Sequence, residues 1–244
     1  MLRFRPEVLP FLLASLAAAI VLLGLLRACG LAWPGAGSWS TGALIILYAY
    51  FLYFFRDPDR TPPGDPQAIV SAGEGHIASI VPLTAEAFRE LCRRSGLQPG
   101  ALGAFEQRGV TRISVFLSPL NVHVNRAPIG GQSRFLGYFP GKHFFTFHEK
   151  SSDANQHNAI LIENAQTRCL LFQIVGPVCR RVMYWPDHDQ PVTVAQGERI
   201  GMMKFGSRLD LYFPATDIAV VVKPGDFVRA GETVIARLHT PGGA

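Results

Sequence analysis

Residues 202–214 read MMKFGSRLDLYFP and place a Gly-Ser peptide bond inside an apolar run that is typical of a β-strand. This bond can cleave itself, because the Ser207 hydroxyl is positioned to attack the Gly206 carbonyl. A glycine leaves that carbonyl open and tolerates a strained backbone. An ester would replace the amide, and β-elimination followed by hydrolysis would leave a pyruvoyl group at a new N-terminus. The stretch therefore predicts a chain that makes its own electrophile.

The sequence around this bond resembles the short bacterial and archaeal type of phosphatidylserine decarboxylase proenzyme, in which F-G-S-R replaces the L-G-S-T of longer relatives. Three further blocks carry the resemblance, in the family's order: FFRDPDRTPP at 54–63, FLSPLNVHVNRAP at 116–128 and QGERIG at 196–201. A lone Gly-Ser pair is common in turns, whereas four long blocks together are specific. The resemblance implies a long chain (1–206) and a short chain (207–244) that carries the pyruvoyl cofactor, which converts phosphatidylserine to phosphatidylethanolamine in phospholipid biosynthesis.

Decarboxylation of an amino acid needs an electron sink, which no natural side chain provides. A ketone at residue 207 can form a Schiff base with the serine headgroup amine and withdraw electrons as pyridoxal phosphate does. The protein then has to bind, orient and reprotonate the substrate. His123 matches a histidine of the family's motif that is thought to assist decarboxylation, and an imidazole suits proton delivery at neutral pH. Without the resemblance, a histidine beside valines indicates a structural residue.

Self-cleavage in the longer relatives is attributed to an Asp-His-Ser arrangement, which this sequence matches imperfectly. The carboxylate of the family's S-P-x-D-G segment is Glu74 here, and the second histidine aligns with Arg126. Because an arginine cannot act as a base, either His123 alone activates Ser207 or another histidine does, with His76 as a candidate. Arg126 is better explained as a ligand of the substrate phosphate or carboxylate, since a guanidinium directs two donors onto an oxyanion; a surface ion pair is its alternative.

Two uncharged runs, 8–26 and 39–55, predict a transmembrane helical hairpin within an anchor of residues 1–56. As a helix, the first run would be about 28 Å long, close to the thickness of a bilayer core. A cleavable signal peptide is the alternative, but no convincing cleavage site is present and a second span follows. Arginines flank the hairpin and place both ends in the cytoplasm, with the catalytic domain on that side of the cell membrane, the inner membrane in a Gram-negative cell. These are Arg3, Arg5, Arg56 and Arg60, while Arg27 opposes this orientation weakly.

Composition is consistent with this organisation. The chain has 244 residues, is 48% apolar and carries a net charge of +5, which favours anionic membrane lipid as a partner. No dense basic run with interleaved aromatic residues indicates nucleic acid. The cysteines show no metal-ligand spacing, so we expect reduced, buried residues in a cytoplasmic domain and no metal site. They are Cys29, Cys92, Cys169 and Cys179.

Residues 57–244 predict a mainly β (α+β) soluble domain of short antiparallel strands with a few helices. The expected strands are 69–70, 75–81, 112–116, 159–163, 169–175, 181–184, 209–213 and 218–222. One helix is expected from Ala85 to about Ser95, with Thr84 as its N-cap. The neighbourhood 82–108 matches the family poorly and has the character of an insertion.

Residues 142–158 are expected to form a loop with Phe144, Phe145 and Phe147, and with His148 and His157. Aromatic side chains beside lysines suit a headgroup interface, so this loop could touch the bilayer, although three phenylalanines are as often core.

Two alternative functions remain open. In the first, MKF at 203–205 resembles a biotin acceptor and 224–232 resembles the hairpin of biotinyl and lipoyl carrier domains, so that Lys204 would be a modified arm. The carrier hypothesis leaves the block around His123 unexplained. In the second, the same chemistry acts on another amine-bearing substrate. The two chains produced by cleavage would stay partners, and a homodimer is left open.

Overall fold

The computed structural model describes residues 2–30, 35–98, 100–146, 154–177 and 182–239. The chain divides into two compact units, Met1–Asp59 and Arg60–Ala244. Each unit has its own secondary structure and is described separately below.

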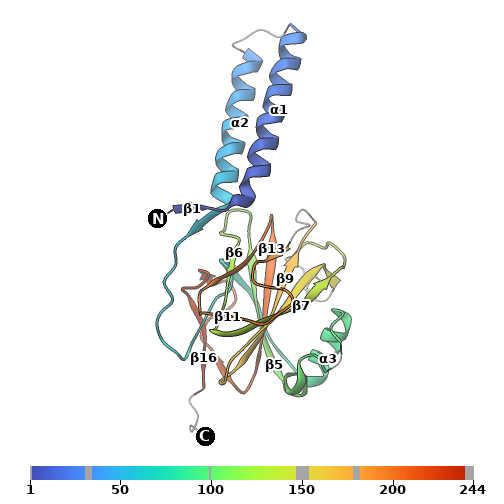
Figure 1. Ribbon diagram of the computed structural model, residues 1–244, viewed down its shortest axis with the longest axis vertical. Helices are drawn as coiled ribbons and strands as arrows, with labels where there is room; N and C mark the ends of the chain where they lie inside the picture. The colour runs from blue at the N-terminus through green and yellow to red at the C-terminus, as the bar shows by residue number, and fades with distance from the viewer. Residues whose placement is uncertain (1, 31–34, 99, 147–153, 178–181, 240–244) are drawn as a thin grey trace. The chain divides into compact units, whose positions relative to one another are not determined.

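The first unit consists of two helices above a short strand pair (Figure 1). Strand β1 (Leu2–Phe4) pairs antiparallel with β2 (Arg56–Pro58). A 3-10 turn, η1 (Pro6–Val8), leads into α1 (Leu9–Ala28), and α2 is Gly35–Phe54. Prolines stand at the start of η1 and of α1, where a missing N–H breaks no helical hydrogen bond. The strand pair therefore joins the two ends of this unit.

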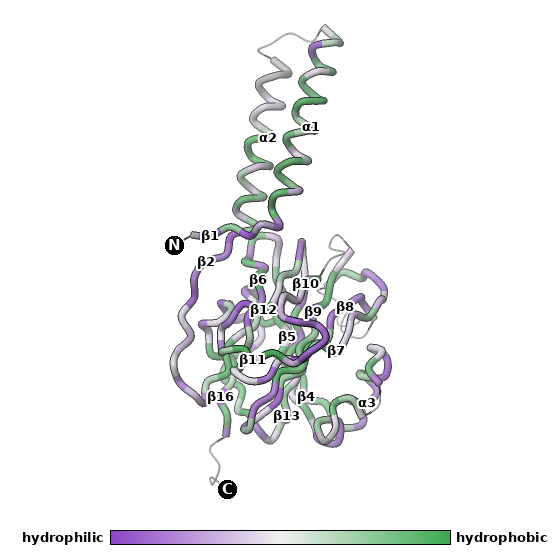
Figure 2. The backbone as a smooth tube through the Cα atoms, viewed as in Figure 1, coloured by the Kyte–Doolittle hydropathy of each residue, from purple (hydrophilic) through white to green (hydrophobic). Residues whose placement is uncertain are grey.

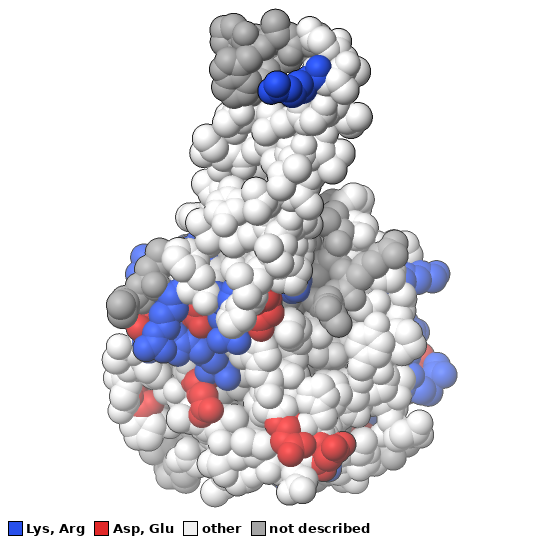
Figure 3. All heavy atoms as spheres, turned by 45° about the horizontal axis from the view of Figure 1, so that its top comes forward, with Lys and Arg blue, Asp and Glu red and all other residues white. Residues whose placement is uncertain are grey.

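The surfaces of the two helices are apolar. Arg27 is the single charged residue within α1, and α2 has none. Figure 2 shows hydrophobic colouring along α1, and Figure 3 shows uncharged atoms over most of the helical surface on the face drawn. In the described part of the chain, one helix is long and apolar enough to cross a membrane, Pro6–Ala28, and the apolar helix Trp39–Phe54 is shorter. The Phe11 ring lies 5.3 Å from that of Phe51, so the helices contact each other.

The second unit is built from antiparallel sheets (Figure 1). The large sheet has eight strands in the order β11-β7-β8-β9-β13-β5-β4-β15, and two three-stranded sheets have the orders β10-β12-β6 and β14-β16-β3. The strands are β3 (Ala68–Val70), β4 (Gly75–Leu83), β5 (Val110–Leu117), β6 (Val124–Arg126), β7 (Gly131–Phe139), β8 (His157–Glu163), β9 (Arg168–Val175), β10 (Val182–Tyr184), β11 (Val192–Val194), β12 (Arg199–Met203), β13 (Ser207–Pro214), β14 (Ile218–Val220), β15 (Phe227–Val228) and β16 (Val234–Leu238). The helices are α3 (Ala85–Arg94) and the 3-10 helix η2 (Gly103–Gln107).

Each face of the large sheet is covered by a separate apolar core. On one face, which we call the inner face, alternate residues of β13 such as Leu209 and Leu211 pack with Ile200 and Met203 of β12 and Ile235 of β16, all buried. On the other face, the helix face, Tyr212 and Phe172 pack with Phe88 of α3. Because β13 is covered on both faces, all of its residues are buried.

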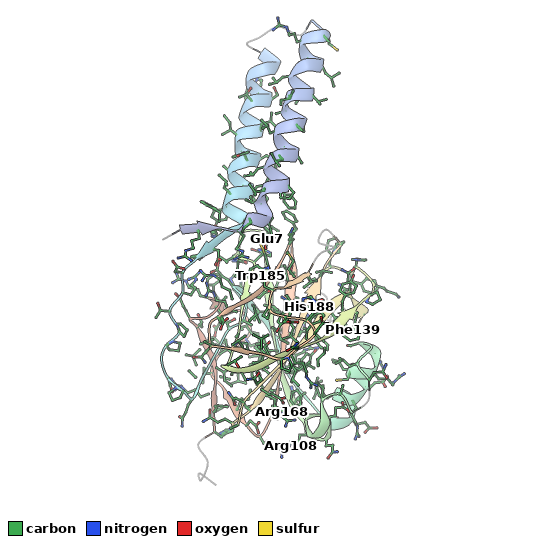
Figure 4. The ribbon with its side chains drawn as sticks, viewed as in Figure 1. Glu7, Arg108, Phe139, Arg168, Trp185 and His188 are labelled. Carbon is green, nitrogen blue, oxygen red and sulfur yellow. The ribbon has the colours of Figure 1, made fainter. Side chains whose placement is uncertain are left out.

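Strand β13 runs through the middle of the large sheet. Ser207 lies opposite Val175 of β9 and Leu117 of β5, and Pro214 lies at the other end of the strand. Arg108 and Arg168 lie near that far end, where they line a small pocket with Pro214 (Figure 4). The Ser207 end and the Pro214 end therefore form opposite ends of the same sheet.

The expected strands and helices are present. A strand covers or overlaps each expected one within the described residues, and α3 begins after Thr84, whose hydroxyl accepts a hydrogen bond from the Ala87 N–H (3.2 Å). The poorly matched segment 82–108 forms α3 and η2 and covers the helix face of the sheet. Residues 224–232 lie between β14 and β16, which pair antiparallel, and they contain the short strand β15, which pairs with β4.

Two expectations were wrong. Residues 157–158 belong to strand β8 and not to a loop, because His157 pairs with Phe139 and Ile174 on the neighbouring strands. Cys29 is exposed at the end of α1, whereas Cys92 and Cys169 are buried; the three are free thiols. Phe147, His148 and Cys179 lie outside the described residues.

The Phe88 side chain anchors the helix face and gives the first prediction. Its ring lies 5.2 Å from that of Phe105 and 5.7 Å from that of Tyr212. We expect Phe88→Ala to lower the free energy of unfolding by about 3–5 kcal/mol, because it leaves a cavity in a closed core. Urea unfolding of the full chain in detergent, in an uncleaved Ser207→Ala background, measures this. Arg89→Ala on the exposed side of α3 is the control and should change the value by less than about 0.5 kcal/mol.

Candidate active site

The Gly206–Ser207 bond follows a strained turn. Strand β12 ends at Met203 and β13 begins at Ser207, so residues 204–206 carry the chain from a small sheet to the large one. Phe205 has φ +50° and Gly206 has φ +74°, and Phe205 is the one non-glycine residue with positive φ in the described chain. A non-glycine residue in this left-handed region costs about 1–3 kcal/mol. Conformational strain is therefore concentrated next to the candidate cleavage bond.

Ser207 is fully buried on the inner face of the large sheet. Its side chain shares that face with Leu209, and its hydroxyl lies 3.5 Å from the Lys204 carbonyl oxygen, a long contact for a hydrogen bond. The serine hydroxyl is thus held close to the backbone of the turn in a site closed to bulk water.

His123 is brought to the same region by strand pairing. The Met203 N–H donates to the His123 carbonyl (3.1 Å), next to the ladder between β6 and β12. Asn125 of β6 contacts the inner face of the large sheet, because its Oδ1 accepts a 2.7 Å hydrogen bond from Nε2 of Gln173 on β9. His123 is buried directly before β6, and its backbone is hydrogen-bonded to Met203, four residues before Ser207.

The tautomer of His123 follows from its backbone contact. Nδ1 lies 2.9 Å from the Asn121 carbonyl oxygen, which can only accept, so Nδ1 carries the proton and Nε2 is the nitrogen that can exchange one in the neutral ring. Asn121 is itself held by Ser118, whose N–H (2.9 Å) and Oγ (2.7 Å) both donate to the Asn121 Oδ1. The Ser-Pro-Leu-Asn segment therefore forms a rigid turn that fixes the imidazole.

Glu74 supports the same turn from a different loop. Its Oε1 accepts from the Val122 N–H (3.0 Å), and its Oε2 accepts from Arg60 (2.5 Å), which also binds Glu232 at 2.9 Å. The preceding Gly73 is packed against the side chains of the inner face beside Ser207. The structure therefore places Glu74 as a buried acceptor that holds the backbone beside His123.

Arg126 and His76 lie on other surfaces. Arg126 has the opposite orientation to Asn125 along β6; its Nη1 donates to the Gly197 carbonyl (2.8 Å), and its side chain packs against Gly231. The prediction that it binds substrate stays a prediction, and this contact favours a structural role. On β4, His76 lies opposite Phe116 of β5, which in turn lies opposite Arg208 of β13 and not Ser207. The exposed His76 ring contacts Phe227, with the ring centroids 5.3 Å apart. His76 therefore shares the helix face and not the inner face that carries Ser207.

Sequence reasoning missed a buried polar chain and an ion pair near the site. On the inner face, Asn158 donates to Gln173 (3.1 Å), which in turn donates to Asn125. On the helix face, Arg208 donates to Asp210 (2.7 Å) and to Ser114 (2.8 Å). Polar residues at alternating strand positions were the available signal, but a sequence does not reveal which of them face each other across strands.

Burial and charge alter the ionisation of the groups on the helix face. Burial of Asp210 raises its pKa, but the charges of Arg208 and Arg112 outweigh that effect and leave the pKa below its usual value. His157 donates from Nδ1 to the Asn155 carbonyl (2.8 Å), and its ring stacks with that of Phe139 at a centroid distance of 5.3 Å. Burial lowers the pKa of His157, so it stays neutral near pH 7. His157 lies on the face away from Ser207 and is not a base for its hydroxyl.

These observations define a mainly β protein with a strained, buried Gly-Ser bond and an oriented histidine. Comparison with known proteins gives the family: the phosphatidylserine decarboxylase family matches residues 47–236. The chain is 38% identical over 199 residues to a phosphatidylserine decarboxylase proenzyme of Chlorobium chlorochromatii, covering 82% of this chain and 84% of that protein. It is 35% identical over 237 residues to that of Gluconacetobacter diazotrophicus, covering 97% and 95%. The chain belongs to the phosphatidylserine decarboxylase proenzyme family.

The contacts of Glu74 yield a prediction about maturation. Glu74→Gln keeps an oxygen for the Val122 N–H but removes the charge opposite Arg60, and a hydrogen bond to a charged group contributes about 1.5–3 kcal/mol. We expect Glu74→Gln to slow cleavage between Gly206 and Ser207 roughly tenfold. Denaturing electrophoresis of samples taken over time measures this rate. Glu232→Gln is a matched control, because Glu232 binds the same arginine without reaching Val122. Equal cleavage rates in the two variants would show that the charge of Glu74 opposite Arg60 is incidental to maturation.

Proposed function

We propose that this chain decarboxylates phosphatidylserine to phosphatidylethanolamine, using a pyruvoyl group made from Ser207 by cleavage of the Gly206–Ser207 bond. Membership of the family supports the reaction, and members of this proenzyme family carry a pyruvoyl group. The observation that carries the assignment to Ser207 is the pair of left-handed residues directly before a fully buried serine.

The proposed cleavage uses groups of the chain and one water molecule. The Ser207 Oγ attacks the Gly206 carbonyl carbon, the C–N bond breaks, and an ester with a free amine replaces the amide. Loss of the Ser207 Cα proton then expels the Gly206 carboxylate, and hydrolysis of the dehydroalanine releases ammonia. The strain at Phe205 and Gly206 is relieved when the bond breaks, which favours the forward direction.

Ser207 fits the position of the cofactor, because it would become the first residue of a buried central strand, where a small ketone is shielded from water. A pyruvoyl group supplies a ketone that takes up the electrons released as carbon dioxide leaves. We assign to His123 the delivery of a proton to the substrate carbon: its Nδ1–H is fixed by the Asn121 carbonyl, so Nε2 takes up a proton from water and then donates it. Glu74 would act by holding the turn that carries His123.

We also propose that α1 and α2 both cross the cell membrane and that the catalytic unit lies on the cytoplasmic side. The two helices carry no charged residue before the last turn of α1, where Arg27 lies, and Arg3, Arg5, Arg56 and Arg60 flank them. This pattern supports two membrane spans with both ends in the cytoplasm. Phe144 and Phe145 are 42% and 56% exposed, and the Lys142 ammonium lies 5.5 Å from the Phe144 ring, a combination that suits a headgroup interface. The carrier-domain alternative for Lys204 has no support in the family to which the chain belongs.

The mass of the purified protein tests the proposed cleavage. We expect two fragments, 1–206 and 207–244, whose masses sum to that of the intact chain plus one water and minus one ammonia. Ser207→Ala should remain one inactive, full-length polypeptide. Borohydride added with phosphatidylserine should trap a substrate adduct on the short fragment. A wild-type chain that stays whole while active would rule the proposal out, and turnover of free serine at the same rate would rule out the lipid substrate.

The role of His123 is tested separately. We expect His123→Ala to lower kcat about 10²–10⁴-fold once cleaved, because general acid catalysis contributes that much. Turnover is measured per short chain, so that slow maturation is not counted as lost activity. His157→Ala is the control, since His157 is also a buried histidine bonded to a backbone carbonyl but lies on the other face of the sheet. Unimpaired turnover in the His123 variant would remove this residue from the mechanism.

A further inference from the structure

Gly176 lies where the carbonyl of the candidate cleavage bond packs. It directly follows β9, whose last residue, Val175, lies opposite Ser207. A Cβ atom added to Gly176 would lie 3.1 Å from the Gly206 carbonyl oxygen and 3.3 Å from the Thr146 methyl group. The Gly206 carbonyl therefore rests against a position that has no side chain.

Space, and not backbone conformation, explains this glycine. Gly176 is not among the residues with positive φ, so an alanine could adopt its backbone angles. Gly206 is the opposite case, because its φ of +74° favours a glycine, whereas a Cβ there would meet nothing within 4 Å. The two glycines meet different requirements of the turn before Ser207. Gly206 allows the backbone to bend, and Gly176 leaves room for the Gly206 carbonyl.

Asn155 fixes the segment that carries Gly176. Its amide nitrogen donates to the Val175 carbonyl (2.8 Å) and to the Phe144 carbonyl (2.7 Å), and its Oδ1 accepts from the Phe144 N–H (3.0 Å). Asn155 is 1% exposed, so these hydrogen bonds are shielded from water. They hold the end of β9 and the Phe144 loop together around the Gly206 carbonyl.

We propose that Gly176 is a positioning residue for self-cleavage, which keeps the Gly206 carbonyl in the geometry that Ser207 attacks, with Asn155 holding Gly176 in place. The inference rests on the proposed cleavage at Ser207. Attack requires the hydroxyl and the carbonyl carbon to be close and aligned, and small displacements slow such reactions strongly. After cleavage Gly206 becomes a chain end, so Gly176 no longer matters for turnover.

Gly176→Ala tests the proposal in the full-length chain. We expect self-cleavage to slow at least about tenfold, while kcat per cleaved short chain stays within about twofold of wild type. Gly109→Ala is the matched control: its Cβ would lie 3.3 Å from the Leu83 carbonyl oxygen, against 3.1 Å to the Gly206 oxygen for Gly176, but at the Pro214 end of the sheet. Cleavage at the control rate, or faster cleavage, would overturn the proposal. A wild-type chain that does not cleave would instead reject the proposed function.

Asn155→Ala provides a second variant should Gly176→Ala fold poorly. Its control is Asn164→Ala, because Asn164 also makes three hydrogen bonds to backbone groups. Asn164 lies in the turn between β8 and β9, at the Pro214 end of the large sheet. We expect slow cleavage in the Asn155 variant only. Equal rates in the two variants would contradict the positioning of Gly176 by Asn155.

Hydroxylamine separates positioning from general destabilisation. It cleaves an ester at Gly206, which gives a hydroxamate at residue 206 and an unmodified serine at residue 207. Wild-type proenzyme should be cleaved faster in its presence, whereas Gly176→Ala should respond weakly, because the ester forms slowly. A variant with wild-type hydroxylamine cleavage would show that ester formation is intact and that Gly176 does not position the carbonyl.

Discussion

The crossing from β12 to β13 within residues 204–206 is the constraint on which the candidate site depends. Each strand is fixed by hydrogen bonds in a different sheet, so the short connection has to bend sharply, and Phe205 and Gly206 take left-handed conformations to do so. The cost of about 1–3 kcal/mol for a non-glycine residue is small beside the burial of two large apolar cores, which keeps the strained turn in place. Strong packing therefore maintains strain at the bond next to Ser207.

The large sheet separates two kinds of chemistry. Its inner face carries Ser207, whereas its helix face carries the ion pair of Arg208 and Asp210. Alternation along one strand places these neighbours in sequence on opposite sides of the sheet. The ion pair of Arg208 and Asp210 thus lies on the opposite side of the sheet from Ser207, and the hydrogen bond from Arg208 to Ser114 links β13 to β5.

The sequence predicted much of this arrangement. The block of residues 116–128 and the Gly-Ser bond identified the family, and β-branched runs located most strands, because both signals are local. Strands such as β7 and β16 were missed because polar residues or glycines interrupt their apolar pattern. The contact of Gly176 with the Gly206 carbonyl could not be predicted, since it depends on which strands are neighbours. The same is true of Arg126, whose side chain direction follows from the register between β6 and β12.

The central position of β13 in the large sheet determines how the two products of the proposed cleavage would be held together. The fragment that starts at residue 207 supplies a middle strand of the large sheet, with β9 on one side and β5 on the other, and two strands of a small sheet through β14 and β16. Separating it would expose both cores at once. The proposed cleavage at its first residue would therefore remove a covalent link without releasing either piece, and a cleaved protein, once unfolded, would have to reassemble from two polypeptides.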